Sequence, residues 1–349
     1  MTNKDNPFIF KEIPIDYYFC NRTKELKELQ AYAKAKANVV IYSPRRYGKT
    51  SLVKRVQSGL AEKKFITIFV DFFGVTSVED IASRIAAAVF AVTRKNESIF
   101  NKALRFIKTF RPVFRPDETG NVGVRIEQAV FPQKALDLLE QTLTALEQFI
   151  KDTKENCHIA LDEFQELLNL PEASQIEALL RTQFQKHPIS YFFVGSRRHL
   201  LLKIFNDKNR PFFQSAINYA LNPLPKDELT QFVFDLFKKH GKNCPQNIAR
   251  SIVEHTHQHP YYTQKLAFFV FEFSSNTVEL KNIEASFDEL IKSERPVFES
   301  ILQGLAPRQI ALLRALAEEP TETILSAGYM KRHQLGSTGA MQGASKKLI

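Results

Sequence analysis

Apolar and polar positions follow two different spacings along the first two thirds of the chain. Apolar runs rich in β-branched and aromatic residues have the length of buried strands, at 38–42, 65–71, 157–162 and 189–195, with a shorter one at 219–221. Segments with a helical spacing of apolar residues lie between them, at 49–60, 78–92 and 176–186. Strands that alternate with helices predict an α/β fold in which helices cover both faces of a parallel sheet.

The last third of the chain has a helical pattern only. The strand signal stops after Pro225, and Arg295-Pro296 marks a second boundary. The length of 349 residues is enough for two or three domains. We therefore expect a sheet domain at 1–224, a helical domain at 225–295 and a third domain at 296–349.

A basic insertion at about 94–126 separates the second and third predicted strands. It is rich in Lys and Arg, and it also contains Phe100, Phe106, Phe110 and Phe114. The basic side chains could bind nucleic acid by neutralising phosphates. The spacing of the four phenylalanines is closer to the core face of a helix, and we prefer that interpretation for the aromatic residues.

A phosphate-binding loop is predicted between the first strand and the next helix. The motif G-x-x-x-x-G-K-[ST] is matched, except at its first position, by Ser43-Pro44-Arg45-Arg46-Tyr47-Gly48-Lys49-Thr50. In this motif backbone N–H groups and the helix N-terminus surround the β- and γ-phosphates of a nucleotide. The strand before and the helix after it argue against a chance Gly-Lys-Thr. Ser43 replaces the first glycine, and its small side chain is compatible with the turn.

Each residue type in this loop suggests a role. Gly48 lets the backbone approach the phosphates, Lys49 places a charge between them, and the Thr50 hydroxyl would ligate Mg²⁺. The sequence therefore predicts a site for ATP and Mg²⁺. The predicted nucleotide-binding residues of this segment are Ser43, Pro44, Arg45, Arg46, Tyr47, Gly48, Lys49, Thr50 and Ser51.

Polar residues end two further predicted strands. Asp162 and Glu163 end the third strand; in P-loop ATPases the first such carboxylate holds Mg²⁺ through water and the second orients or deprotonates the attacking water. An aspartate at a strand end can instead cap a helix. Ser196 follows the fourth strand, at the edge where open parallel sheets bind ligands. Its hydroxyl could sense the γ-phosphate or cap the following helix.

Composition narrows the class of protein. The chain is 44% hydrophobic and 25% charged, which is typical of a globular protein with real cores. Cys20, Cys157 and Cys244 lie far apart without a CxxC pair, which argues against a disulfide framework and a zinc ribbon. No signal peptide and no apolar run long enough to span a membrane are found, so we expect a cytoplasmic protein. The net charge of +10 fits either a nucleic-acid partner or a solvated lysine-rich surface.

The motifs taken together resemble those of the archaeal-type P-loop ATPase family, in the STAND and origin-recognition branch of the AAA+ ATPases. The resemblance extends over nearly the whole chain and rests on Asn21-Arg22-x-x-Glu25-Leu26, the phosphate loop, Leu161-Asp162-Glu163-Phe164-Gln165, Val194-Gly195-Ser196 and His259-Pro260-Tyr261-Tyr262. It implies a three-layer P-loop domain, a helical lid and a C-terminal winged helix.

The resemblance also implies roles for individual residues. Arg22 would lie beside the adenine, and Pro260 would lie where the lid closes over the nucleotide. Ser196 matches the sensor position. Arg210 could act as an arginine finger on the nucleotide of a neighbouring subunit, or it could be a solvated charge. The residues expected to act in catalysis are Lys49, Glu163, Ser196 and Arg210, and those expected at the metal are Thr50 and Asp162.

The C-terminal segment has the pattern of a helix-turn-helix. Pro307 can begin a helix, and Ser337 precedes a helix with Gln342, Lys346 and Lys347 on its polar face. Such a helix could lie in a DNA major groove, or the domain could be an internal clamp on the ATPase. Because a wing hairpin would be expected to follow at Ile349, we expect this domain to be incomplete in the sequence.

Two functions follow from these patterns. The first is an ATP-hydrolysing molecular switch that couples nucleotide state to a helix-turn-helix output domain. The second is an initiator-like or transposition-associated ATPase in which ATP orders assembly on DNA. A small-molecule kinase is disfavoured, because no cluster of lid arginines is found. The expected partners are ATP and ADP, duplex DNA through the C-terminal helices and the basic insertion, and a second copy of the chain or another protein.

Overall fold

The computed structural model describes residues 5–93, 110–116, 122–128 and 134–348. The chain divides into two compact units, Met1–Phe268 and Phe269–Ile349. Each unit is described by itself.

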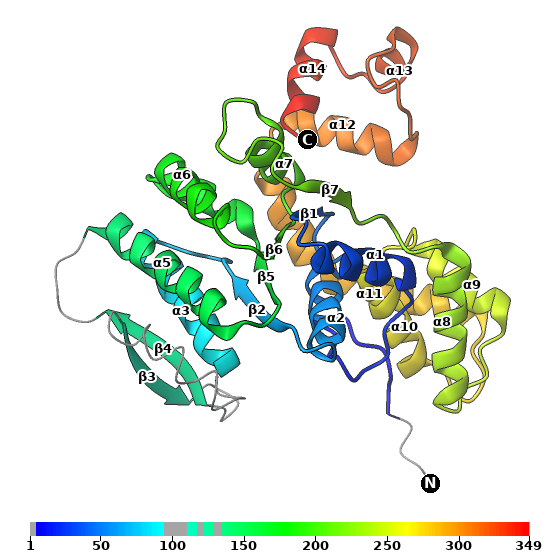
Figure 1. Ribbon diagram of the computed structural model, residues 1–349. Helices are drawn as coiled ribbons and strands as arrows, with labels where there is room; N and C mark the ends of the chain where they lie inside the picture. Colours follow the sequence, from blue (N-terminus) through cyan, green and yellow to red (C-terminus); the bar gives the residue numbers. More distant parts are fainter. Residues whose placement is uncertain (1–4, 94–109, 117–121, 129–133, 349) are drawn as a thin grey trace. The chain divides into compact units, whose positions relative to one another are not determined.

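A five-stranded parallel sheet forms the centre of the first unit (Figure 1). Its strands are ordered β2-β5-β6-β1-β7, with bounds Ile66–Asp71, Cys157–Asp162, Ser190–Gly195, Val39–Tyr42 and Ile217–Ala220. The five strands predicted from the apolar runs are thus confirmed to within a few residues. Strands β5 and β6 are buried along their whole length, as expected for parallel strands covered on both faces.

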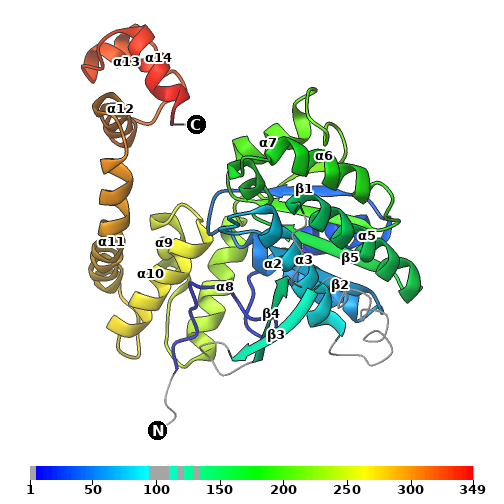
Figure 2. The same cartoon turned by 90° about the vertical axis from the view of Figure 1, so that its left-hand side faces the viewer.

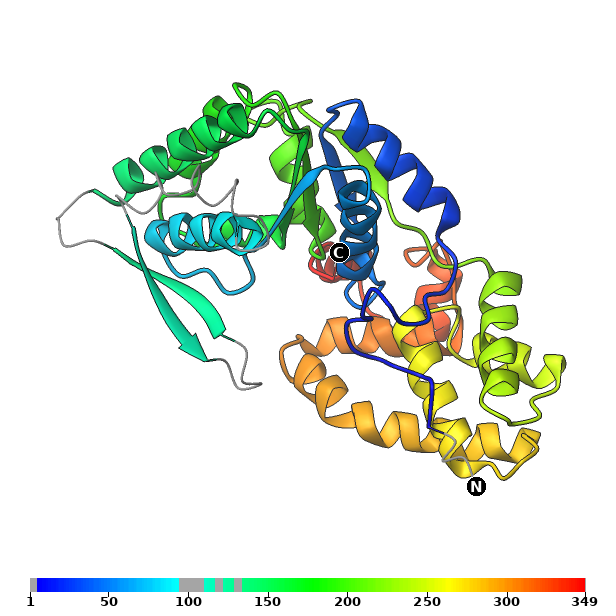
Figure 3. The same ribbon diagram turned by 60° about the horizontal axis from the view of Figure 1, so that its bottom comes forward.

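Helices cover both faces of this sheet. On one face, α1 (Thr23–Lys34) and α2 (Lys49–Ala61) pack on β1 and β6 through Leu29, Leu52, Val53, Val56 and Leu60. The other face is covered by α3 (Val78–Thr93), α5 (Ala135–Thr153), α6 (Ala173–Phe184) and α7 (Arg198–Asn206). Figure 2 shows α5, α6 and α7 together on that face, and Figure 3 shows α1 and α2, in dark and medium blue, on the opposite one. The predicted three-layer arrangement is confirmed.

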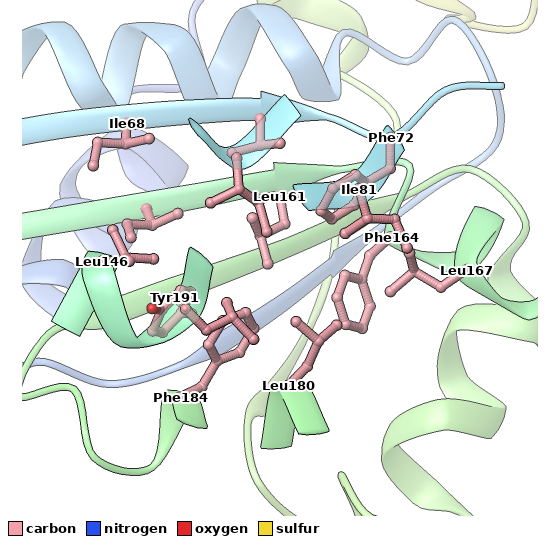
Figure 4. Close-up of a cluster of buried hydrophobic side chains, with 14 of the residues drawn as sticks. Ile68, Phe72, Ile81, Leu146, Leu161, Phe164, Leu167, Leu180, Phe184 and Tyr191 are labelled. Atoms are coloured by element: carbon pink, nitrogen blue, oxygen red, sulfur yellow. The ribbon is translucent and has the colours of Figure 1, made fainter. Parts of the chain in front are cut away.

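Eight buried phenylalanines belong to the larger core cluster. Figure 4 shows Phe164, Phe184 and Tyr191 within this cluster of buried side chains. Phe212 belongs to the same cluster, with its ring centroid 5.3 Å from that of Phe205 and 5.6 Å from that of Phe164. Tilted and edge-to-face pairs at these distances stabilise a core beyond the burial of area alone.

Part of the basic insertion is a β-hairpin. Strands β3 (Phe110–Pro116) and β4 (Val122–Gln128) pair antiparallel and form a separate two-stranded sheet. The helical interpretation of the phenylalanine spacing was therefore wrong for Phe110 and Phe114, which lie on β3. The other two phenylalanines of that pattern, Phe100 and Phe106, lie outside the described residues.

Helices follow the sheet as the pattern predicted. The first unit continues with α8 (Lys226–Lys239) and α9 (Gln246–His255), and the division between the units falls within α10 (Pro260–Phe273). In the second unit α11 (Leu280–Gln303) runs through Arg295 and carries Pro296 inside it. The division into 1–224, 225–295 and 296–349 stays a proposal.

The end of the second unit is a small helical cluster. Helices α12 (Pro307–Glu318), α13 (Ala327–Arg332) and α14 (Thr338–Lys346) pack around Leu312, Ala315, Tyr329, Met330, Leu335 and Met341. Within the described ranges of the chain, no helix is both long enough and apolar enough to cross a membrane.

The pair Phe212 and Phe213 tests the aromatic core. Phe212 is 1% exposed and Phe213 is 38% exposed. We expect Phe212→Ala to lower the free energy of unfolding by about 3–5 kcal/mol, because it removes a large buried ring and leaves a cavity. Phe213→Ala should lower the free energy of unfolding by about 1 kcal/mol or less. Urea unfolding followed by circular dichroism measures both, and equal losses would contradict this account of the core.

Candidate functional site

The carboxyl ends of the parallel strands bring the predicted polar residues to one edge of the sheet. In the strand register Asp71 lies opposite Asp162 on β2 and β5, and Tyr42 lies opposite Gly195 on β1 and β6. The loop after β1 and the residues after β5 and β6 therefore meet at this edge. This is the position at which open parallel sheets bind ligands.

The phosphate loop has the backbone geometry that its sequence requires. Gly48 immediately precedes α2 and has a φ of 81°, in the left-handed region that favours glycine. Ser43 keeps a negative φ, is 3% exposed, and donates a hydrogen bond from its hydroxyl to the Pro44 carbonyl at 3.3 Å. Since only Gly48 of these two positions needs a positive φ, serine is compatible with the first position of the motif.

Lys49 is buried inside the loop. Its ammonium donates hydrogen bonds to the carbonyls of Ser43 at 3.0 Å and Pro44 at 2.9 Å. Burial lowers the pKa of Lys49, whereas the charges of Glu163 and Asp162 oppose that shift. The lysine is thus held beside the two carboxylates by oxygens of its own loop.

Asp162 joins the loop to the central strand. The Thr50 hydroxyl donates a 2.6 Å hydrogen bond to Oδ2 of Asp162, and the backbone N–H of Glu163 donates to Oδ1 at 3.0 Å. Burial raises the pKa of Asp162, and the bond from Thr50 opposes this shift. The hydroxyl and carboxylate oxygens are the ligand types that Mg²⁺ prefers.

Glu163 is held by two neutral donors. Its Oε2 accepts a 2.9 Å hydrogen bond from the Ser196 hydroxyl and a second bond from the side-chain amide of Gln165. Gln165 is fully buried against Gly195, and a Cβ added at Gly195 would lie 2.0 Å from the Gln165 Oε1. The Ser196 hydroxyl therefore contacts Glu163 and does not cap α7, whose N-cap residue is Arg197.

A cavity of about 680 Å³ opens at this edge of the sheet. It is lined by the phosphate loop, by Asp71 at the end of β2, and by Asp162 and Glu163 at the end of β5. The N-terminal segment, Arg22, the start of α8 and the start of α10 also line it. The predicted site residues that line the cavity are Arg22, Arg45, Arg46, Tyr47, Gly48, Lys49, Thr50, Ser51, Asp162, Glu163, Ser196 and Pro260.

Three predicted site residues lie outside the lining of the cavity. Ser43 and Pro44 form the base of the loop and contact Lys49 instead. Arg210 forms an ion pair with Glu177 of α6, whose side chain is 1% exposed. The proposed action of Arg210 on a neighbouring subunit stays a prediction.

Several residues at or beside the cavity were not named as site residues by the sequence reasoning. Asp71 ends β2, Phe73 follows it, and Gln264 lies on α10, all in the cavity lining, whereas Gln165 donates to Glu163 from outside the lining. A signal for Asp71 was present, because it ends a predicted strand in the same way as Asp162. Gln165 lies within the Leu161–Gln165 motif on which the resemblance rests, but no role was assigned to it. Gln264 had no such signal, because only the packing of distant segments brings it to the cavity.

The N-terminal segment is attached to α2 beside the loop. The backbone N–H of Ile13 donates to the Ser51 hydroxyl at 3.2 Å, and Lys54 pairs with Glu12 at 2.6 Å. Arg55 donates to the carbonyl of Ile15 at 2.7 Å, as well as to those of Pro14 and Tyr17. The Ser51 side chain, predicted at the nucleotide, thus binds this segment.

Residues 259–262 contact the phosphate loop. The Arg46 guanidinium lies 4.1 Å from the ring centroid of Tyr261, and the rings of Tyr47 and His259 meet edge-to-face at 4.8 Å. Burial lowers the pKa of His259, and the charge of Arg46 acts in the same direction. The start of α10 is therefore in direct contact with the loop that is predicted to bind phosphates.

A parallel sheet in this strand order, with a Gly-Lys-Thr loop after β1 and acidic residues at the end of β5, defines the fold of a P-loop ATPase. Residues 19–266 match the family described as "ATPase domain predominantly from Archaea". Because this match spans more than half of the chain, the protein belongs to that family, and the predicted resemblance is confirmed. Residues 296–349 match a probable winged helix domain.

Three solved structures with a similar fold illustrate what the chain is similar to. A Walker-type ATPase of Pyrococcus abyssi superposes with a TM-score of 0.61 at 18% identity, over 86% of this chain and 80% of that one. The Aeropyrum pernix ORC2 protein has a TM-score of 0.57 at 17% identity, over 93% of this chain and 82% of that one. The Aeropyrum pernix ORC1 protein in complex with DNA has a TM-score of 0.57 at 12% identity, over 100% of this chain and 88% of that one. No curated protein matches the chain.

The burial of Asp162 leads to a testable pH dependence. Because folding raises its pKa, the folded state binds the proton more tightly, and the free energy of unfolding falls as pH rises above the unfolded value of about 4. Asp162→Asn removes the free-energy cost of burying the charged carboxylate. The asparagine side chain can still form hydrogen bonds with the Thr50 hydroxyl and the Glu163 N–H. Without nucleotide we expect the variant to melt a few degrees higher than the wild type at pH 7.

Thermal unfolding from pH 4 to 8 measures the difference in melting temperature between Asp162→Asn and the wild type, which should shrink towards pH 4. The exposed Asp235→Asn on α8 is the matched control and should change little at any pH. A lower melting temperature for Asp162→Asn at pH 7 would show that the buried charge stabilises the empty site.

Proposed function

We propose that the protein binds ATP with Mg²⁺ in this cavity, hydrolyses it, and uses the nucleotide state as a switch. The observation that carries the proposal is the presence of Lys49, Thr50, Asp162 and Glu163 in the lining of one cavity. A buried cation, a hydroxyl bonded to a carboxylate, and a second carboxylate next to it in the chain are groups that phosphoryl transfer requires.

The residues present fit a nucleotide and its metal. The N-terminus of α2 and the N–H groups of the loop favour phosphate oxygens. Thr50 and Asp162, joined at 2.6 Å, supply the oxygen ligands for Mg²⁺, which neutralises charge on the phosphates when bound. Lys49 would exchange its bonds to the Ser43 and Pro44 carbonyls for phosphate oxygens.

Glu163 would orient and deprotonate the attacking water. Two donors hold its Oε2, from Ser196 and Gln165, so that the carboxylate has a defined orientation. Gln165 thereby acts as a positioning residue in this proposal, and Ser196 links the carboxylate to the end of β6. A general base held in this way contributes about 10²–10⁴-fold to a rate.

Contacts of the phosphate loop support the switch. Arg46 and Tyr47 touch Tyr261 and His259 at the start of α10, so a nucleotide that moves the loop would change the packing of the helices that follow the sheet. A switch needs an element with differential contacts in its two states, and this loop-to-helix contact provides one.

Glu163→Gln separates binding from hydrolysis. We expect ATP affinity to stay within about threefold of the wild type, because Gln keeps the size of the side chain, and turnover to fall by about 10²-fold or more. Lys49→Ala should weaken ATP binding by about 10- to 100-fold, because it removes a charge-assisted contact to phosphate. Glu155→Gln, an exposed position before β5, is the control.

Calorimetric titration with ATP and Mg²⁺ and the rate of phosphate release measure the two properties. Turnover by Glu163→Gln at the wild-type rate would remove Glu163 from the mechanism. Wild-type protein that binds no ATP would reject the proposed function itself.

A second function, DNA binding by the C-terminal domain, is favoured by the winged-helix match at residues 296–349. Lys346 and Lys347 are exposed at the end of α14, and the chain carries a net charge of +10. In this function ATP would order assembly of the protein on DNA. The Aeropyrum pernix ORC1 protein, which has a similar fold, was solved in complex with DNA.

Fluorescence anisotropy with duplex DNA at 50 and 200 mM salt tests this second function. We expect affinity to fall with salt, and the double variant Lys346→Glu with Lys347→Glu to reduce the slope of log affinity against log salt by about 2. The pair Lys238→Glu with Lys239→Glu on α8 is the matched control. An unchanged slope in the α14 variant would exclude these residues as phosphate contacts.

A further inference from the structure

Two buried polar atoms without a hydrogen-bond partner belong to residues that line the cavity but lie outside the phosphate loop. They are Nη2 of Arg22 and Oε1 of Gln264. Buried polar groups are nearly always paired, and leaving one unpaired costs about 1–3 kcal/mol. A donor and an acceptor left unpaired at the same cavity indicate a ligand that supplies both partners.

The surroundings hold both residues in place. Arg22 is 5% exposed, and its other terminal nitrogen donates to Glu25 at 2.7 Å. Gln264 lies one helical turn after Tyr261 on α10. Phe10 packs edge-to-face on Tyr261, with ring centroids 6.1 Å apart. The unpaired atoms therefore belong to side chains on packed elements.

The cavity also has apolar side chains that suit a planar ring. Its lining includes Phe10, Phe19 and Leu229 besides the phosphate loop. An aromatic heterocycle can be covered by such side chains and still offer polar atoms at its rim. Because one cavity contains these apolar residues and the phosphate loop, the ring and the phosphates would belong to one nucleotide.

We propose that Gln264 selects the base of the nucleotide, its carbonyl oxygen accepting a hydrogen bond from the exocyclic amine of adenine. This inference rests on the proposed function, since it names the feature of ATP that the same site would recognise. Arg22 donates, and any purine ring nitrogen or the guanine carbonyl can accept from it. Arg22 therefore binds a purine without distinguishing adenine from guanine.

Gln264 does distinguish the two bases. An acceptor in the protein pairs with the 6-amino group of adenine, but it faces the 6-oxo group of guanine as one acceptor faces another. A site built to bond a substrate NH group rejects analogues that lack it, because the buried protein atom is then left unpaired. The selection acts on binding, since the 6-amino group of the base takes no part in the transfer of the γ-phosphate.

The probe is purine riboside 5′-triphosphate, which differs from ATP only by a hydrogen in place of the 6-amino group. We expect wild-type protein with Mg²⁺ to bind ATP about 5- to 10-fold more tightly than this analogue, the ratio that one hydrogen bond supplies. Gln264→Leu should bind the two nucleotides within about twofold of each other. Gln264→Met is a second variant of similar length, for use if the first unfolds.

The control is Gln231→Leu, an exposed glutamine on α8, which should keep the wild-type ratio. For wild-type protein the two triphosphates should differ in KM and share one kcat, because the amine does not touch the reacting phosphate. A loss of stability alone would weaken the binding of both nucleotides equally and leave the ratio of the two affinities unchanged.

The outcomes separate this inference from the proposed function. If wild-type protein binds ATP but Gln264→Leu and Gln264→Met keep the full preference for it, the assignment of Gln264 is wrong and the ATP site stands. Equal binding of both triphosphates by the wild type would also overturn the assignment. If the wild type binds neither triphosphate, the proposed function itself fails.

Discussion

The buried carboxylate of Asp162 is the constraint on which the arrangement of the site depends. A charge removed from water at the end of a central strand is costly unless hydrogen bonds compensate for it. Two donors do so here, the Thr50 hydroxyl at the start of α2 and the backbone N–H of Glu163. These bonds join the phosphate loop to β5, so the strand order of the sheet determines which groups face each other.

Hydrogen bonds also connect the residues that follow Asp162 and β6. Glu163, Gln165 and Ser196 form one connected set, and Gly195 leaves the space that the Gln165 side chain occupies. Pairing is incomplete at Oε1 of Gln165, and also at Nη2 of Arg22 and Oε1 of Gln264, two residues that line the cavity.

Much of the fold could be predicted because its signals are local. Continuous apolar runs indicate strands buried on both faces, and the Gly48 position needs a left-handed backbone whatever surrounds it. The hairpin at β3 and β4 was not predicted, because a phenylalanine spacing close to that of a helix also fits a strand. Residues such as Gln264 were missed because nothing in their own segment marks them.

The sequence by itself determined the alternation of strands and helices, the phosphate loop and the acidic end of β5, because each depends on residue type and spacing within a few positions. Only the tertiary structure decided that Arg210 pairs with Glu177, that the Ser51 hydroxyl binds the N-terminal segment, and that Arg22 and Gln264 line one cavity. The physical reason is that these contacts join segments far apart in the chain, and a side chain acquires its partner only when the packing of the core sets the distance between them.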